Sequence, residues 1–542
     1  MSHARTLIRS QPYACIIGWG RISVLIGRTP DTETALLRRR GMAWLYPPPT
    51  AETASCLHNR LGSPSGYVSA KTTSKFKVRK CTLMYKINFT TPCHVHFIGI
   101  GGISMSGLAE ILLEEHFTVS GSDSKESALT DHLTAGGATI FYGQKAANII
   151  DGIDVVVYTA AIHEDNEEYM EAKRQNLPML SRAELLGQLM TNYNTPVAVA
   201  GTHGKTTTTS MLSHVFLAGG LDPTISVGGI LKAIHGNIRV GNSDLFLTEA
   251  CEYTNSFLHF FPKISIILNI DADHLDFFKD LDDIRRSFRL FARLLPKDGT
   301  LVINGDIENL SYITDGLPCR VITFGQEPAL DYSAMNITYN EQGNASFDVV
   351  KSGSAIGHID LSVGGEHNVY NALSAIAVSD ILSIPLNTVQ EGLHSFHGTD
   401  RRFEYKGEIN GITIIDDYAH HPTEIEATLK AASHYPHRKL WCIFQPHTYT
   451  RTKALFEEFA QALSHADHII LADIYAARES DTLGVSSRQL ADEVRRFGCD
   501  AVYLPDFPSI EKYVAQHCAK GDVLITMGAG DVVTIGEELL KA

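Results

Sequence analysis

With 542 residues, the chain is several times longer than an average domain of about 150 residues, which predicts three or four domains and excludes a single compact unit. Its 44% hydrophobic and 20% charged residues are typical of a globular protein and exclude a chain that is disordered throughout. Nine cysteines without a CxxC pair argue against a disulfide framework and a structural zinc site, and they favour a reducing cytoplasm. No apolar run approaches the roughly 20 residues that cross a bilayer, so we expect no membrane insertion.

The formal net charge of −15 is distributed unevenly along the chain. Residues 1–83 hold thirteen Lys and Arg against Asp31, Glu33 and Glu52, so the rest of the chain is strongly acidic. Because that acidic part has no basic stripe, we expect no binding of nucleic acid. Residues 1–83 also lack helix or strand periodicity and predict a disordered leader. Two interpretations stay open: a start placed upstream of the natural one at Met84, which we favour, and an Arg-rich transit peptide.

From residue 95 onward, short β-branched runs alternate with helix-length amphipathic segments. The runs lie at 95–98, 154–158, 197–200, 245–249 and 264–270. This alternation is typical of an α/β fold with mainly parallel strands. Residues 332–363 alternate polar and apolar side chains and predict antiparallel strands, and a further α/β unit begins near Ile412. Boundaries near 190 and 400 give domains at 84–190, 191–399 and 400–542.

A glycine loop follows the first predicted strand and opens a helix. It reads Gly99, Ile100, Gly101 and Gly102, and Asp123 ends the next predicted strand. Glycines there let the backbone approach a phosphate at a helix N-terminus, and an acid at that strand end can accept a ribose hydroxyl. The loop predicts a nucleotide ligand, and a tight turn without a ligand is the alternative. The next helix glycine lies too far along the chain for the dinucleotide fingerprint.

A second loop has the composition of a phosphate-binding loop. It follows the strand at 197–200 and reads Gly201, Thr202, His203, Gly204, Lys205, Thr206 and Thr207. In such a loop the backbone amides surround phosphates, the lysine reaches the β- and γ-oxygens, and the first threonine hydroxyl binds Mg²⁺. Val199 stands where the strict pattern has its first glycine. The alternative is a helix start that binds nothing.

Acidic clusters end the next two predicted strands. The first contains Glu249 and Glu252, and the second contains Asp271, Asp273 and His274. Open α/β sheets bind ligands at the carboxyl ends of their strands. Oxygen donors and an imidazole beside a triphosphate site therefore predict magnesium-assisted phosphoryl transfer, with helix capping as the alternative.

Three further polar motifs follow at helix starts and strand ends. Asn368 and Asn371 open a helix beside His367 and predict contacts with a base edge or a helix cap. The segments 416–424 and 445–453 each follow a strand of the last unit. Their charges predict an interdomain cleft that positions a carboxylate substrate and a transferring phosphate.

These motifs resemble the Mur ligase family in order and spacing, over residues 84–542. The resemblance rests on 201–207, Asp273 with His274, His367 with Asn368, 401–403 and 416–424. It implies three domains: a Rossmann-like UDP-binding domain, a central P-loop ATPase domain with a mainly parallel sheet, and a Rossmann-like C-terminal ligase domain. The first glycine loop together with 418–424, 445–447 and 527–531 resembles the alanine-adding branch. The implied reaction joins L-alanine to UDP-N-acetylmuramate at the expense of ATP, through an acyl phosphate, in bacterial peptidoglycan synthesis in the cytoplasm.

The resemblance also implies a role for each matched residue. Those implied for catalysis are Lys205, His274, Arg402, His447 and Arg451. Those implied for ATP are Gly201, Thr202, His203, Gly204, Lys205, Thr206, Thr207, Asn368, Asn371, Arg402 and Asp417. Mg²⁺ is assigned to Thr206, Glu249 and His274, and the UDP-sugar to Gly99, Ile100, Gly101, Gly102 and Asp123.

Two positions depart from relatives of this family. Many relatives have arginine where Thr448 stands, which leaves open how the work is divided between that position and Arg451. Siblings that add later amino acids carry a modified lysine where this chain reads Ser287, Phe288 and Arg289, which agrees with the alanine-adding branch. The alternative is a ligase that attaches a preformed tripeptide. A dehydrogenase, a GTPase switch or a regulator without turnover would each leave part of these motifs unused.

Overall fold

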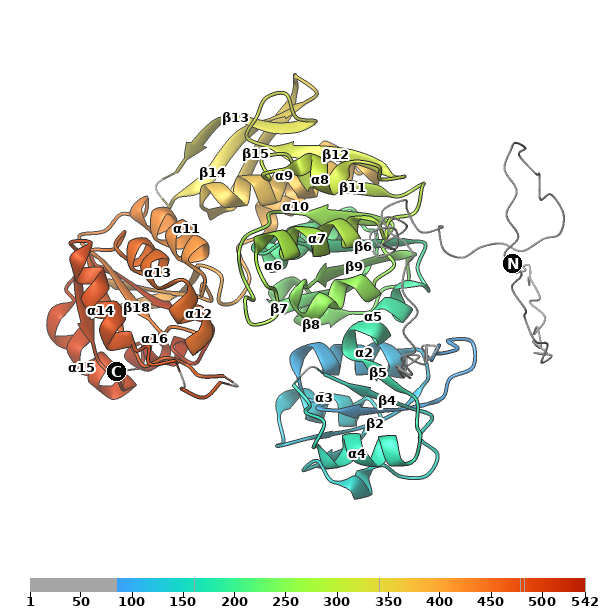
Figure 1. The fold of residues 1–542 in the computed structure, drawn as a ribbon. Coiled ribbons are helices and arrows are strands. Elements are labelled where there is room, and N and C mark those ends of the chain that lie inside the picture. The colour runs from blue at the N-terminus through green and yellow to red at the C-terminus, as the bar shows by residue number, and fades with distance from the viewer. Residues whose placement is uncertain (1–84, 160, 341, 478, 482, 542) are drawn as a thin grey trace, which may run out of the picture. The chain divides into compact units, whose positions relative to one another are not determined.

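The computed structural model describes residues 85–159, 161–340, 342–477, 479–481 and 483–541. The expectations for residues 1–83 lie outside these ranges. The described ranges belong to one compact unit, in which the strands build three separate sheets (Figure 1). No helix in the described ranges is both long and apolar enough to cross a membrane.

The first sheet is parallel throughout, with the order β3-β2-β1-β4-β5. Its strands are β1 (His94–Ile98), β2 (Thr118–Asp123), β3 (Thr139–Tyr142), β4 (Val155–Tyr158) and β5 (Met179–Ser181). Its helical segments are α2 (Ile103–Glu114), α3 (Ala128–Ala135), η2 (Ala146–Asn148), α4 (Glu167–Arg174) and α5 (Arg182–Met190). Because the strands are parallel, the loops after β1, β4 and β5 meet at one edge of the sheet.

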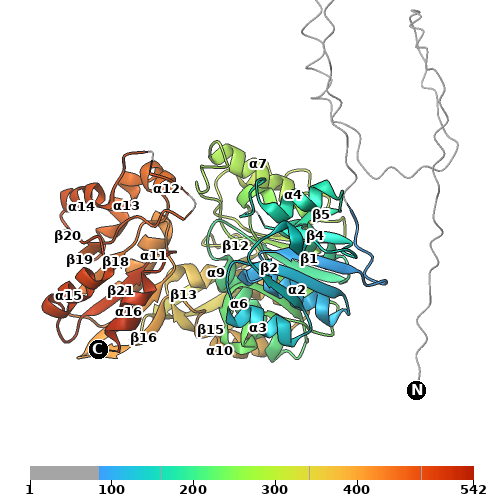
Figure 2. The same cartoon turned by 90° about the horizontal axis from the view of Figure 1, so that it is seen from below.

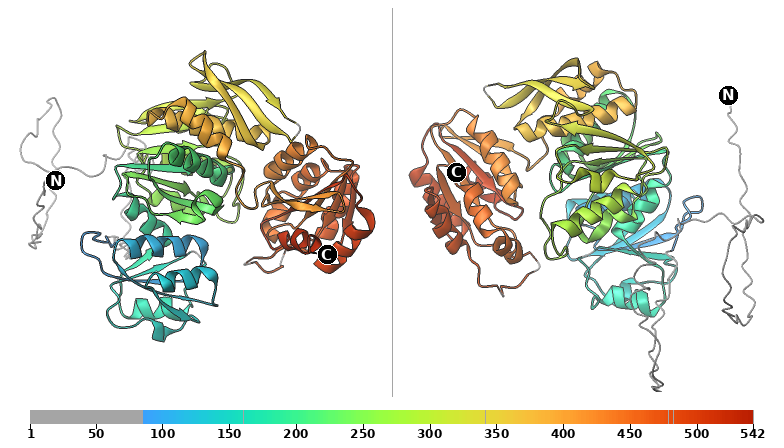
Figure 3. Two further views of the ribbon diagram at one scale, coloured as in Figure 1. Left: turned by 180° about the vertical axis from the view of Figure 1, so that it is seen from behind. Right: turned by 45° about the horizontal axis from the view of Figure 1, so that its top comes forward.

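The second sheet has ten strands in the order β15-β14-β13-β12-β11-β10-β6-β9-β7-β8. Its parallel part comprises β6 (Thr195–Ala200), β7 (Thr224–Leu231), β9 (Leu245–Ala250), β10 (Ile264–Ile267), β11 (Thr300–Asn304) and β12 (Arg320–Gly325). Its antiparallel ends are β8 (Gly236–Arg239) beside β7 and the meander of β13 (Tyr332–Tyr339), β14 (Asn344–Lys351) and β15 (Ser354–Gly364). The meander, yellow in Figure 3, confirms the antiparallel prediction for 332–363.

The helical segments of this part of the chain begin with α6 directly after the phosphate-binding loop. They are α6 (Lys205–Ala218), η3 (Lys232–Ile234), η4 (Tyr253–His259), α7 (Leu281–Ala292), α8 (Leu310–Thr314), α9 (Glu366–Ile381) and α10 (Leu386–Ser395). The predicted strand at 264–270 is too long by three residues, because β10 ends at Ile267. Past that point the backbone leaves the ladder, and Asn269 Oδ1 accepts a hydrogen bond from the amide of His203.

The third sheet has the order β16-β17-β21-β18-β19-β20. Its strands are β16 (Glu404–Ile409), β17 (Ile412–Asp417), β18 (Leu440–Phe444), β19 (His468–Leu471), β20 (Asp500–Tyr503) and β21 (Val523–Met527), and only β16 runs antiparallel to its neighbour. Its helices are α11 (Pro422–Ser433), α12 (Tyr449–Ala454), α13 (Phe456–Leu463), α14 (Ser487–Arg496), α15 (Phe507–His517) and α16 (Val533–Leu539). Figure 2 shows helices on both faces of this sheet, α13 and α14 on one and α15 and α16 on the other.

The hydrophobic cores explain why these layers hold together. One cluster joins the first sheet to one face of the second through α5, whose Leu185, Leu186 and Leu189 pack in the same core as Phe257. A second cluster fills the opposite face of the second sheet under α6 and α9. Two more clusters line the two faces of the third sheet. This arrangement confirms the predicted α/β class with mainly parallel sheets.

Candidate active site

The phosphate-binding loop joins β6 to α6, and its glycines are required by geometry. Gly204 caps α6 with φ of 82°, a left-handed conformation that glycine adopts without strain. A Cβ on Gly204 would lie 2.7 Å from Oδ1 of Asn371, so the position has no room for a side chain. The loop therefore brings its backbone directly against the start of α9.

Lys205 lies across its own loop and contacts a buried carboxylate. Its Nζ donates to the carbonyl oxygen of Thr202 at 3.0 Å and to Oε2 of Glu252 at 3.0 Å. Burial alone would lower the pKa of Lys205, but the charge of Glu252 raises it above the usual value. The lysine therefore remains cationic at the position that a phosphate would approach.

Glu252 also contacts the histidine of the second acidic cluster. Its carboxylate is 2% exposed, and its Oε1 lies 3.5 Å from Nε2 of His274. Burial would raise the pKa of Glu252, but the charges of Lys205 and His274 lower it below its usual value. Sequence reasoning placed Glu252 in an acidic cluster without giving it a role. The structure identifies it as the shared partner of Lys205 and His274.

Thr206 and Glu249 lie against two consecutive glycines of β7. A Cβ on Gly228 would lie 2.8 Å from Oε2 of Glu249, and one on Gly229 would lie 3.3 Å from the Thr206 methyl group. Both side chains therefore lie against the same two-residue segment of β7. In the described ranges, no three His, Cys, Asp or Glu side chains gather as a metal cluster. Magnesium binds through one or two protein oxygens together with phosphates and waters, so this pair fits its chemistry.

His274 has its own set of contacts beside this pair. Its Nε2 lies 3.5 Å from Oε1 of Glu252 and 3.7 Å from Oδ2 of Asp273, and its ring packs against Tyr253 with centroids 4.6 Å apart. Its backbone takes φ of 53°, an uncommon conformation for a residue with a Cβ. No contact links His274 directly to Thr206 or Glu249 among the residues that the structure describes.

A cavity of about 370 Å³ lies beside the phosphate-binding loop. It is lined by His203, Gly204 and Thr207 of the loop, by Asn368 and Asn371 of α9, and by Arg402, Phe403 and Asp417 of the third domain. Inside it, Nδ2 of Asn371 donates to Oδ1 of Asn368 at 3.0 Å, and Nδ2 of Asn368 donates to the carbonyl oxygen of Gly364 at 2.7 Å. Apolar side chains such as Leu268, Phe324 and Phe403 complete the lining. A cavity of this size with both apolar and polar lining residues suits a nucleoside.

Asp417 lies deep in the wall of this cavity. It is 6% exposed, and burial raises its pKa to about 6 despite the opposing charge of Arg402. Its Oδ2 accepts hydrogen bonds from the backbone amide of Phe403 at 3.0 Å and from the Thr428 hydroxyl at 3.1 Å. Asp417 therefore fixes the chain segment that carries Arg402 and Phe403.

Ion pairs connect the loop to the third domain. Nδ1 of His203 lies 3.2 Å from Oε1 of Glu424, its Nε2 lies 3.4 Å from Oδ2 of Asp271, and Arg402 lies 3.6 Å from Glu424. Burial would lower the pKa of His203, but these two carboxylates raise it to about 9. His421 adds a hydrogen bond from Nε2 to the carbonyl oxygen of Ala272 at 3.1 Å. Glu424 was not among the predicted site residues, although it lies in the motif at 416–424.

Arg451 bridges the two domains at a second point. Its Nη2 lies 3.0 Å from Oδ1 of Asp273, and its Nη1 lies 3.1 Å from Nδ1 of His447. Burial lowers the pKa of His447 to about 4, and the charge of Arg451 adds to this effect. Because arginine only donates hydrogen bonds, Nδ1 of His447 accepts and its Nε2 carries the proton. His447 is thus a neutral hydrogen-bond donor.

Thr448 caps the helix that carries Arg451. Its backbone takes φ of 65°, a strained conformation for a β-branched residue, and its hydroxyl accepts from the Arg451 amide at 3.5 Å. Oε2 of Glu479 holds the next turn through the Thr450 amide at 2.9 Å. The domain contacts on this helix are made by Arg451, and Thr448 supports the turn that positions it.

The first glycine loop lies at the edge of the first sheet. Gly99 takes φ of 83°, and the amide of Gly101 donates to Oδ2 of Asp123 at 2.8 Å. A Cβ on Gly101 would lie 2.8 Å from the same oxygen, so only glycine fits there. Ile100 is buried, and Gly102 caps α2. Asp123 therefore holds the loop against the end of β2.

Comparison with known proteins identifies the family. The Mur ligase family catalytic domain matches residues 94–194, the Mur ligase middle domain matches 199–379, and the Mur ligase glutamate ligase domain matches 401–530. UDP-N-acetylmuramate–L-alanine ligase of Lachnospira eligens is 59% identical to this chain, and the match covers 84% of this chain and 100% of that protein. The ligase of the same name from Agathobacter rectalis is 60% identical, and the match covers 84% of this chain and 100% of that protein.

Solved structures agree with these matches. UDP-N-acetylmuramate-alanine ligase from Thermotoga maritima superposes with a TM-score of 0.70 at 31% identity, over 83% of this chain and 98% of that one. A murein peptide ligase from Psychrobacter arcticus superposes with a TM-score of 0.62 at 26% identity, over 83% of this chain and 98% of that one. On this sequence identity, coverage and shared fold, the chain belongs to the Mur ligase family.

Proposed function

We propose that this chain joins L-alanine to UDP-N-acetylmuramate with conversion of ATP to ADP and phosphate. The observation that carries the proposal is the convergence of the phosphate-binding loop and the third domain on one nucleoside-sized cavity. Relatives that are 59% and 60% identical and matched over their full length carry the name of this activity. The recycling ligase, which has solved relatives that are 26% and 31% identical to this chain, is the second candidate.

The first half of the reaction transfers the γ-phosphate of ATP to the carboxylate of the sugar nucleotide. The carboxylate oxygen attacks phosphorus, the bond to ADP breaks, and an acyl phosphate results. Lys205 offsets the charge that develops on the β- and γ-oxygens. Such electrostatic stabilisation is usually the largest single contribution to catalysis of phosphoryl transfer. Asn368 and Asn371 bind the adenine, and Arg402 with Asp417 closes the nucleotide site from the third domain. Thr206, Glu249 and His274 would hold magnesium, which would supply further neutralisation of phosphate charge.

The second half forms the amide bond. The neutral amine of L-alanine attacks the acyl carbon, the bond between that carbon and the phosphate oxygen breaks, and the amine proton leaves with the phosphate. His447 donates a hydrogen bond from Nε2, and Arg451 supplies a fixed positive charge, so together they suit the carboxylate of the amino acid or the acyl phosphate. The Gly99 to Gly102 loop with Asp123 holds the UDP moiety at the edge of the first sheet. We place the reaction in the bacterial cytoplasm, where these substrates occur.

Phosphate release by the full-length protein tests the proposal. ATP, magnesium and UDP-N-acetylmuramate are supplied, and each L-amino acid or the murein tripeptide is added separately. We expect phosphate release only when the sugar nucleotide and L-alanine are both present. Release with the tripeptide alone assigns the chain to recycling, and release that ignores the sugar nucleotide contradicts both candidates.

A further inference from the structure

Arg182 stands where the first sheet meets the phosphate-binding region. It is the first residue of α5 and directly follows β5. Because the first sheet is parallel, the carboxyl end of β5 lies at the same edge as the Gly99 to Gly102 loop after β1. Arg182 therefore projects from the edge at which an open α/β sheet binds its ligand.

The helix that carries Arg182 is docked on the second domain. A Cβ on Gly187 would lie 1.9 Å from the carbonyl oxygen of His259, so the backbones of α5 and the end of η4 are in direct contact. Leu185 and Leu189 pack in one core with Phe257 of η4. η4 begins one residue after Glu252. The docking thus holds Arg182 beside the acidic cluster that ends β9.

The side chain of Arg182 makes no hydrogen bond or ion pair with any residue that the structure describes. Glu184, an acid on the same helix, does not pair with Arg182. Its Oε2 accepts a hydrogen bond from the backbone amide of Ser181 at 2.6 Å. Burial lowers the pKa of Arg182, and Cys251 and Glu249 act in the opposite direction. The side chain of Arg182 is partly buried and has no carboxylate partner, so its guanidinium group is free to bind an anionic ligand.

The chemistry around Arg182 selects the kind of anion. Glu249 and Glu252 repel any anion that approaches the phosphate-binding loop, so a substrate carboxylate needs a cation at this point. Lys205 and the loop amides already face the phosphates of ATP. An arginine fork matches a carboxylate through two parallel hydrogen bonds.

We propose that Arg182 binds the carboxylate of the sugar nucleotide and holds it in position for attack on the γ-phosphate. This inference rests on the proposed function, because it requires a UDP-sugar that bears a carboxylate. Arg182 is thereby the residue that distinguishes such a sugar nucleotide from one without the acid.

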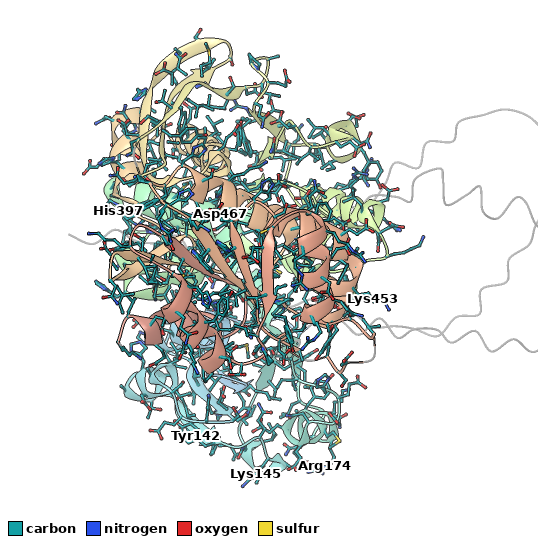
Figure 4. All side chains as sticks on the ribbon, turned by 90° about the vertical axis from the view of Figure 1, so that its left-hand side faces the viewer. Tyr142, Lys145, Arg174, His397, Lys453 and Asp467 are labelled. Atoms are coloured by element: carbon teal, nitrogen blue, oxygen red, sulfur yellow. The ribbon has the colours of Figure 1, made fainter. Side chains whose placement is uncertain are left out.

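Isothermal titration of the full-length protein in the absence of ATP tests this role. UDP-N-acetylmuramate is compared with UDP-N-acetylglucosamine, which lacks the carboxylate. In Arg182→Gln we expect affinity for the first ligand to fall about 10- to 100-fold, the range for a hydrogen bond to a charged group, with affinity for the second unchanged. Arg182→Lys keeps the positive charge but cannot form two parallel hydrogen bonds, so its affinity for UDP-N-acetylmuramate should lie between those of the unaltered protein and Arg182→Gln. Arg174→Gln, which removes an exposed arginine of the same domain (Figure 4), should change the affinity for neither UDP-sugar.

Several results would overturn the inference. If the affinities for both UDP-sugars fell equally, Arg182 would contact the diphosphate or only support the fold. If both affinities stayed unchanged, Arg182 would not belong to the binding site. If Arg182→Gln does not fold, the same comparison is made with Arg182→Lys, and a loss that is not selective for the carboxylate ligand rejects the role. Failure of the unaltered protein to bind UDP-N-acetylmuramate would reject the proposed function itself.

Discussion

At the residue scale, single buried charges determine how the phosphate site is arranged. Glu252 is the clearest case, because it contacts both Lys205 and His274 while it is almost completely buried. The ion pair of Lys205 with Glu252 is costly to desolvate, and removal of either residue leaves the charge of the other uncompensated. The position of Lys205 therefore depends on a residue outside the phosphate-binding motif.

Substitution Glu252→Gln should destabilise the protein by about 1 to 3 kcal/mol, the range for loss of a buried hydrogen bond to a charged group. The amide keeps the shape of the side chain and removes its charge. The thermal unfolding midpoint measures the effect. Glu164→Gln is the matched control, because its pair with Lys173 is exposed and should contribute almost nothing. Equal midpoints for both variants would show that Glu252 is not needed to hold Lys205.

Substitution Lys205→Ala should abolish turnover and leave binding of the UDP-sugar largely intact. In the proposed function the lysine binds the ATP phosphates, whereas the first domain binds the sugar nucleotide. Phosphate release and titration with UDP-N-acetylmuramate measure the two properties separately. A parallel loss of both would contradict the assignment of the two ligands to separate domains.

At the element scale, close backbone contacts fix the helices that carry site residues. α5 approaches η4 so closely that Gly187 cannot accept a side chain. α6 begins where Gly204 lies against Asn371 of α9, so the phosphate-binding loop packs directly on α9. These contacts require glycine because a Cβ would meet fixed atoms, and for Gly187 the obstacle is backbone.

Substitution Gly187→Ala should lower the thermal midpoint by several degrees. Alanine favours a helix interior over glycine by up to about 1 kcal/mol, but overpacking against a backbone carbonyl costs about 1 to 3 kcal/mol or more. Differential scanning fluorimetry provides the measurement. Gly136→Ala is the control, because a Cβ there meets its nearest atoms at an ordinary 3.4 Å. A midpoint for Gly187→Ala at or above that of the unaltered protein would show that α5 and η4 are loosely packed.

At the scale of the whole molecule, a few ion pairs hold the third domain against the phosphate-binding loop. His203 contacts Asp271 of the second domain and Glu424 of the third, and Arg451 reaches from α12 to Asp273. The two pairs made by His203 depend on the protonation of this histidine, whereas the pair made by Arg451 does not.

The stability of this arrangement should decrease with rising pH. The pKa of His203 is about 9 in the folded protein and about 6.5 in an unfolded chain. Its raised value means that the stabilisation is complete below about pH 6.5 and is lost as pH rises towards 9. We expect the difference in thermal midpoint between the unaltered protein and His203→Gln to shrink across this window. A difference that stays constant would show that His203 is not protonated in the fold.

The motif residues could be recognised from the sequence because their signals are local. Glycines at strand ends, the Gly-Lys-Thr start of α6 and the alternation of strands with helices reflect backbone constraints within about ten residues. The family resemblance added the domain order, and the sheets and the sequence comparison confirm the fold and the family. The end of β10 was predicted too late, because Leu268 and Ile270 are as apolar as the strand before them and only the tertiary contact of Asn269 with His203 marks the change.

The amino-acid sequence by itself determined the α/β class, the family and the positions of both glycine loops. Only the tertiary structure decided which charges meet. Several carboxylates end neighbouring strands, and the sheet order and domain packing select Glu252 for Lys205 and Glu424 for His203. The same packing places Arg182 beside Glu249 without a direct partner. Such pairings join residues far apart in the chain, and no local pattern encodes them because their energy exists only once the domains have packed.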